Sequence, residues 1–187
     1  MSRPVRIVLL ALAALAALAA GGCGNRTETA IIGETEGIYV SVDELTYQVQ
    51  ISRILNPASV EDQAYLAGLP EGEEPTAEQV WFAIFMRVEN ETQEELAATD
   101  TFTIVDTQDN HFEPIELDPE LNEFSYEARP IPSGELLPEA NSPASDNTIQ
   151  GALLLFKVDI QSLYNRPLEL EIESLSGGDN ATVDLDV

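Results

Sequence analysis

Few residues of this chain could support nucleophilic, acid–base or zinc chemistry. The sequence contains one histidine, His111, and one cysteine, Cys23. A serine or cysteine nucleophile needs a base that a third group orients. His111 directly follows the turn pair Asp109-Asn110, where a surface histidine is the simpler interpretation. Because a zinc site needs several Cys and His ligands together, we expect neither catalysis nor zinc binding, and the chain is not expected to be an enzyme.

Carboxylates are the abundant chemical group. Asp and Glu number 34 against 8 Lys and Arg, and the formal net charge at pH 7 is −26. A glycosidase uses two such groups, but nothing in the sequence marks one pair among so many. The alternating Glu169, Glu171 and Glu173 indicate the solvated face of a strand.

Calcium is the metal that this composition favours, because Ca²⁺ takes carboxylate and carbonyl oxygens from loops. Asp106, Asp109 and Asp118 surround one expected hairpin and are the candidate ligands. No calcium loop of the EF-hand type is present. Two interpretations stay open, a specific calcium site and loosely held counterions, and no other cofactor is expected.

The segment that ends at Cys23 has the order of a secretory signal. Arg3 and Arg6 precede an apolar run over residues 7–20, and Gly21-Gly22 leads to the cysteine. Residues 1–22 therefore resemble a bacterial lipoprotein signal peptide, with acyl chains carried by Cys23. The alternatives are an uncleaved anchor, for which the run is shorter than the roughly 20 residues of a span, and cleavage without lipid.

This signal predicts the domain organisation and the location. We expect a flexible tether over residues 23–36 and one domain over residues 37–187, held by lipid at the extracytoplasmic face of a bacterial membrane. With Cys23 as the sole cysteine, no disulfide can form within the chain. Nucleic acid is excluded as a partner, because phosphate contacts need clustered Lys and Arg.

The mature sequence reads as a series of short strands. Residues 45–52 alternate apolar and polar side chains, whereas residues 80–88 are apolar on both faces, which is typical of a central strand covered on both sides. Further strands are expected at residues 38–42, 101–106, 111–115, 149–158, 168–173 and 181–187. The pattern predicts an all-β fold, an antiparallel β-sandwich, with a barrel as the alternative.

Two segments interrupt this pattern. Residues 56–78 form an insertion in which Ser59 could begin a short helix that Gly68-Leu-Pro70 ends. Residues 128–147 are rich in proline and small polar residues and are expected to form a long irregular connection.

Several of these segments stand in a recognisable order. A strand ends at Asn90, Phe102–Asp106 leads to the turn Asp109-Asn110, and residues 149–158 contain Gly151 ahead of Leu-Leu-Leu-Phe. The chain resembles the telokin-like, immunoglobulin-like extracellular domains of bacterial lipoproteins of unknown function. It differs by the insertion and by Asn110 where glycine is usual. The resemblance implies an immunoglobulin-like sandwich that acts by interaction rather than catalysis.

Three functions are therefore weighed. The first is a tethered interaction domain for an envelope protein or a ligand, whose exposed apolar patch is sought on the insertion, at Tyr65, Leu66 and Leu69. The second is a small-molecule-binding lipoprotein with a pocket near His111, Trp81 or Tyr126. The third is an acidic, calcium-binding surface protein.

Overall fold

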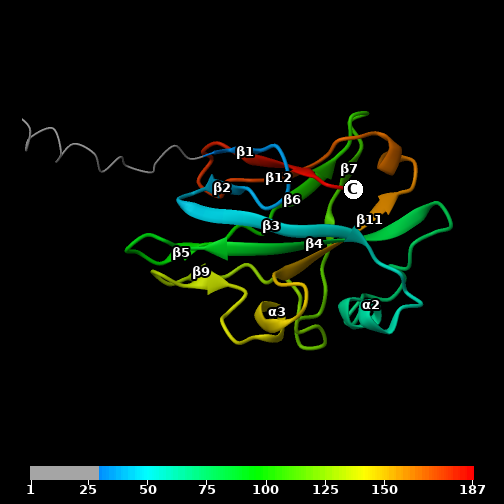
Figure 1. Ribbon diagram of the computed structural model, residues 1–187, viewed down its shortest axis with the longest axis horizontal. Coiled ribbons are helices and arrows are strands. Elements are labelled where there is room, and N and C mark those ends of the chain that lie inside the picture. Colours follow the sequence, from blue (N-terminus) through cyan, green and yellow to red (C-terminus); the bar gives the residue numbers. More distant parts are fainter. Residues whose placement is uncertain (1–29) are drawn as a thin grey trace, which may run out of the picture.

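The computed structural model describes residues 30–187, which form two facing β-sheets with few helices (Figure 1). Residues 1–22 and Cys23, the expected signal peptide and lipid attachment point, lie outside the described residues. The larger sheet has the order β2 (Tyr39–Val42), β3 (Leu45–Ile54), β4 (Gln79–Glu89), β11 (Ala152–Asp159) and β8 (Pro114–Ile115), with β10 (Leu136–Leu137) also paired to β4.

The second sheet has the order β1 (Ile32–Gly33), β13 (Ala181–Leu185), β12 (Leu168–Ile172), β6 (Phe102–Val105) and β7 (His111–Phe112). A small separate ladder joins β5 (Leu96–Ala97) to β9 (Pro130–Ile131). The helices of the described chain are α2 (Val60–Tyr65), α3 (Pro143–Asp146) and the single 3₁₀ turn η1 (Ser162–Tyr164).

The strand order is that of an immunoglobulin domain. β3-β4-β11-β8 corresponds to the order A-B-E-D, and β13-β12-β6-β7 corresponds to G-F-C-C′. These neighbours all pair antiparallel, whereas the N-terminal β1 runs parallel to β13. The prediction of an all-β, immunoglobulin-like antiparallel sandwich is confirmed, and the barrel alternative is wrong, because the chain builds two separate sheets.

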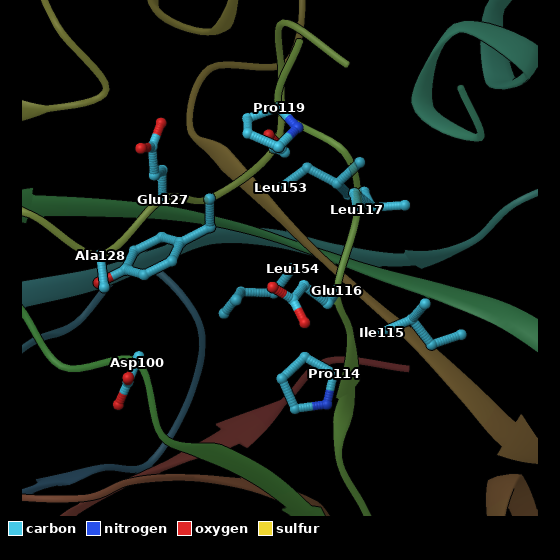
Figure 2. A pocket seen from close by; sticks show the side chains of 12 residues that line it. Asp100, Pro114, Ile115, Glu116, Leu117, Pro119, Glu127, Ala128, Leu153 and Leu154 are labelled. Atoms are coloured by element: carbon cyan, nitrogen blue, oxygen red, sulfur yellow. The ribbon is translucent and has the colours of Figure 1, made fainter. Parts of the chain in front are cut away.

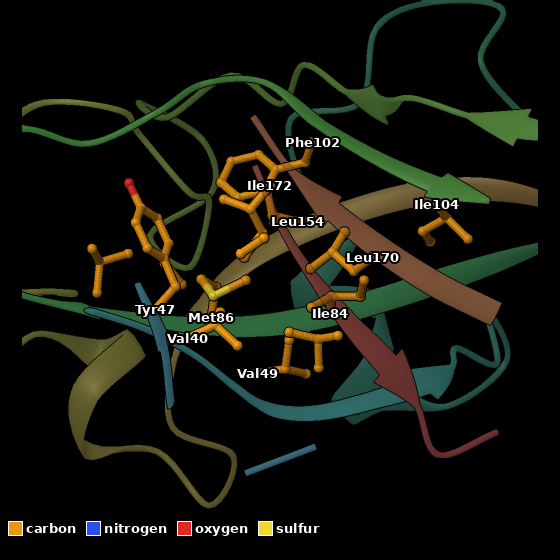
Figure 3. Packing of buried hydrophobic residues seen from close by; sticks show 14 of the residues in the cluster. Val40, Tyr47, Val49, Ile84, Met86, Phe102, Ile104, Leu154, Leu170 and Ile172 are labelled. Carbon is orange, nitrogen blue, oxygen red and sulfur yellow. The ribbon is translucent and has the colours of Figure 1, made fainter. Parts of the chain in front are cut away.

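The main core lies between the two sheets (Figure 3). Alternate residues of each strand point inward, so β4 contributes Phe82, Ile84 and Met86 while β12 contributes Leu170 and Ile172. All five side chains are fully buried. Since no disulfide can bridge the sheets, burial of these apolar side chains supplies the stabilisation.

A second core covers the outer face of the larger sheet. The other face of β4 presents Trp81, Ala83 and Phe85 to it, which confirms that this strand is covered on both sides. Tyr65 of α2 contacts both Phe85 and Phe124 edge to face, with ring centroids 5.0 Å apart in each pair. The insertion at residues 56–78 therefore covers the sheet.

This arrangement corrects the expected exposed patch on the insertion. Tyr65 is fully buried, and Leu66 and Leu69 are half-buried against the second core. The helix does begin after Ser59, as predicted, and residues 66–70 end it.

The expected tether at residues 23–36 is wrong at its C-terminal end. Ile32-Gly33 form β1, and the Glu36 carboxylate accepts hydrogen bonds from the backbone N–H groups of Ser52 and Asp186, at 3.0 Å each. Folded structure thus begins before residue 37, because the free edge of β13 offers backbone groups that a parallel strand can pair.

Two further expectations need correction. Residues 111–115 form two strands, because the chain crosses between the sheets at Glu113, leaving β7 in one sheet and β8 in the other. Residues 128–147 are less irregular than expected, since they contain β9, β10 and α3.

Candidate functional site

A groove opens along the edge of the larger sheet, at β11 (Figure 2). Its volume is about 510 Å³. Ile115 and Pro119 supply partly exposed apolar surface, and the buried Leu153 and Leu154 of β11 also adjoin the groove. Three carboxylates, those of Asp100, Glu116 and Glu127, border it as well.

The groove exists because two segments share the edge of β11 without meeting. β8 pairs with β11 only as far as Ile115, which lies opposite Leu155. The chain then leaves the sheet and returns at Ser125, which bridges to Leu153, and the Tyr126 N–H donates to the Leu153 carbonyl at 2.8 Å. The space between the departing and returning segments stays open above apolar side chains.

Tyr126 forms one wall of the groove and is fixed there. Its hydroxyl donates to the Thr99 carbonyl at 2.8 Å, and its ring lies edge to face with Phe102 at a centroid distance of 5.1 Å. The Thr99 N–H in turn donates to the Tyr47 hydroxyl at 3.0 Å. Burial raises the pKa of Tyr47 to about 12 and that of Tyr126 well above its usual value, so both phenols stay neutral.

The three carboxylates at the groove are exposed, and no basic side chain of the described residues neutralises their charge. Within residues 30–187, neither Asp100, Glu116 nor Glu127 forms an ion pair. Asp100 accepts one hydrogen bond, from the Thr101 hydroxyl at 3.0 Å. The site thus combines an apolar surface with negative charge, a combination that attracts a ligand carrying both apolar and positively charged groups.

Asp106, one of the predicted calcium ligands, is a buried structural acceptor. It accepts hydrogen bonds from Gln108 N–H, from the Asn110 backbone and side chain, and from the Asn165 side chain, at 2.9–3.0 Å. Burial opposes ionisation of Asp106, but these hydrogen bonds outweigh it and hold the pKa of its carboxyl well below the usual range. Through these hydrogen bonds the Asp106 carboxylate links the β6–β7 turn to Asn165.

The other candidate residues lie on the surface and do not gather around Asp106. Asp109 and His111 are both exposed and contact each other, with Oδ1 and Nε2 3.1 Å apart. Asp118 is exposed and accepts from the Glu120 N–H at 2.9 Å. In the part of the chain from residue 30 onward, no three Asp, Glu, His or Cys side chains form a group that could hold a metal ion.

Sequence reasoning named Tyr126 but missed the rest of the groove. Glu116 and Glu127 are two among many acids, and Leu153 belongs to an ordinary apolar strand. What makes them a site is the departure of the chain from β11 after Ile115, and only a proline-rich, acidic stretch at residues 113–120 hints at that departure.

Comparison with solved structures identifies the fold. The yjhA protein of Bacillus subtilis matches 82% of this chain and 99% of its own, with 11% sequence identity and a TM-score of 0.52. This chain shares the fold of that protein. No protein-family model matches the sequence, and no curated protein matches it.

Two further structures are similar at a lower level. The proposed lipoprotein ycdA of Bacillus subtilis has 14% identity and a TM-score of 0.49, and the match covers 79% of this chain but 38% of that one. An uncharacterised β-sandwich protein of Clostridium difficile has 14% identity and a TM-score of 0.47, with 87% and 99% covered. Among the described residues, no helix has the length and apolar character needed to span a membrane.

Proposed function

We propose that this protein is a membrane-tethered binding domain, and that the groove at β11 receives a positively charged, partly apolar peptide segment of a partner protein. The observation that carries the proposal is the juxtaposition of an apolar lining with three unpaired carboxylates, those of Asp100, Glu116 and Glu127. Binding rather than catalysis is proposed, since the groove holds no nucleophile paired with a base.

Charge selects the class of partner. The whole chain carries a net charge of −26, and the groove adds local negative charge above an apolar surface. A basic segment gains long-range attraction during encounter and short-range pairing once bound, whereas an acidic segment is repelled at both stages. An apolar side chain of the segment would pack against Ile115 and Pro119, which remain partly exposed in the groove.

The setting of this function is the outer face of a bacterial membrane. The proposal includes acylation of Cys23 and membership of the telokin-like group of exported domains, both suggested by the sequence. A lipid anchor suits such a chain, because an acidic domain is repelled by anionic lipid and would otherwise leave the surface.

Calorimetric titration tests the groove. The probe is a short peptide, blocked at both ends, in which lysine and leucine alternate. We expect saturable binding that weakens about five- to tenfold in the double variant Glu116→Gln/Glu127→Gln, since each exposed ion pair contributes a fraction of a kcal/mol to about 1 kcal/mol.

The control variant is Glu169→Gln/Glu171→Gln, which makes the same charge change on β12 of the other sheet. It should leave the affinity nearly unchanged. Equal losses in the two double variants would refute a specific groove, and so would equal affinity for a peptide in which serine replaces leucine.

The tether has its own experiment. In the native bacterium, Cys23→Ala should move the protein from the membrane to the soluble secreted fraction, because the residue that accepts the acyl chains is absent. Retention of the variant in the membrane would show that residues 7–20 act as an uncleaved anchor. This result would leave the groove proposal intact.

A further inference from the structure

A second, smaller cavity lies over the outer face of the larger sheet and shares no lining residue with the acidic groove. Its volume is about 220 Å³. Arg87 of β4, Gln50 of β3 and Asp146 of α3 line it, together with Asn141 and Gln150 from the segments that flank α3.

Arg87 stands apart from the other cations of the described chain. Arg53, Arg129 and Lys157 are each ion-paired with a carboxylate, and Arg166 donates its Nε–H to a backbone carbonyl. Arg87 donates no hydrogen bond within residues 30–187, and its Nε is buried without an acceptor. The nearest carboxylate, that of Glu89, lies 3.6 Å from Nη2, outside good hydrogen-bond geometry.

A buried donor without a partner is costly, and native structures contain few. The fold therefore holds at this cavity a guanidinium whose one ion pair, with Glu89, is long and whose buried Nε has no hydrogen-bond acceptor among the described residues. The side chain is 37% exposed, so part of it remains accessible to a ligand. Arg87 follows Phe85 on the outer face of β4, at the point where the second core gives way to this cavity.

The rest of the cavity lining combines apolar residues, among them Leu136 and Pro138, with polar side chains and one carboxylate. Gln50 is the extra residue of the bulge between Val49 and Ile51, a device that turns a side chain out of the regular pleat. The side-chain amides of Asn141 and Gln150 form no hydrogen bond with the described residues. Asp146 is exposed, accepts only from the Ser145 hydroxyl, and makes no ion pair with Arg87.

We propose that this cavity binds a small zwitterion of the α-amino-acid type, with its carboxylate held by Arg87 and its ammonium group held by Asp146. A guanidinium matches a carboxylate with two parallel hydrogen bonds. The cavity is smaller than the roughly 300–1,000 Å³ of drug-sized ligand pockets. A purely anionic ligand would be repelled by the net charge of −26, and a purely cationic one would meet Arg87.

Thermal unfolding of the purified protein in the presence of each of the twenty L-amino acids, one at a time, tests the proposal. At least one amino acid should raise the unfolding midpoint, because a ligand that binds only the folded state stabilises it. Calorimetric titration then compares that amino acid with its amide, which lacks the carboxylate, and with its deaminated acid, which lacks the ammonium group. Both analogues should bind at least about tenfold more weakly.

Variants locate the site. Arg87→Gln and Asp146→Asn should each weaken binding about tenfold or more, whereas Arg166→Gln, which removes a charge outside the cavity, should not. Asp146 is exposed, so its variant keeps the test valid even if the Arg87 variant unfolds. The proposal fails if no amino acid raises the midpoint, if the amide binds as tightly as the acid, or if Asp146→Asn leaves the affinity unchanged.

Discussion

At the scale of single residues, Asp106 shows how a carboxylate can be structural in an acidic protein. Replacing it with Asn puts an amide N–H₂ against donors and should lower the free energy of unfolding at pH 7 by about 2–3 kcal/mol. Chemical denaturation measures this loss, and Asp109→Asn, on the exposed neighbour, should change the stability by no more than about 0.5 kcal/mol.

The Asp106 contribution also depends on pH in a definite direction. Because folding lowers the pKa of this carboxyl, the folded state binds its proton less readily than the unfolded state does. The stabilisation is therefore complete above the usual Asp pKa of about 4 and is lost as the pH falls below it. The difference in stability between the wild type and Asp106→Asn should shrink between about pH 5 and pH 3, and a constant difference would contradict this assignment.

Gly151 gives a second prediction at this scale. Its φ is +126°, and a Cβ there would lie 2.9 Å from the Phe85 carbonyl carbon. Gly151→Ala should cost about 3 kcal/mol, from the strained backbone and the overlap together. Gly134→Ala is the matched control, since Gly134 also has a positive φ but open space around it, and should cost about 1 kcal/mol. Equal costs would show that the close approach to Phe85 is unimportant.

At the scale of elements, the insertion at residues 56–78 acts as a cover for the sheet. Tyr65→Ala removes a buried ring that contacts Phe85 and Phe124, and should lower the free energy of unfolding by about 3–4 kcal/mol. Val60→Ala in the same helix, where the side chain is 84% exposed, should change it by less than about 0.5 kcal/mol. A small effect of Tyr65→Ala on the thermal midpoint would mean that the cover is dispensable.

The same elements show what could be predicted from the sequence. Alternation of apolar and polar residues identified the strands around β3 and β12, and the apolar run on both faces identified β4 as central. These predictions succeeded because a strand face that is buried must consist of apolar residues. The crossing at Glu113 and the pairing of β1 could not be predicted, since both depend on which sheet edge is free in the folded molecule. The groove and Arg87 were missed for a related reason. What distinguishes them is that the groove carboxylates form no ion pair and the Arg87 Nε has no acceptor within the described residues, and a sequence pattern does not show which side chains lack a partner.

At the scale of the whole molecule, the net charge of −26 is the main electrostatic feature of the protein. Its self-repulsion opposes the compact state and is screened by salt. The thermal midpoint should therefore rise by a few degrees between about 0.01 M and about 0.5 M sodium chloride. Neutralising any one exposed carboxylate outside a hydrogen-bond network, such as Glu91→Gln, should raise the midpoint slightly at low salt. A midpoint that does not respond to salt would show that the charges are spaced too widely to repel.

In the function that we propose for the groove, this charge would attract basic partners to the surface, and the apolar lining would determine where they bind. The most direct measurement is nuclear magnetic resonance of the isotope-labelled protein during titration with the lysine–leucine peptide. We expect the amide signals of Ile115, Tyr126 and Leu153 to shift together and to saturate. Shifts scattered over acidic surfaces far from β11, or no shift at these three residues, would contradict the account.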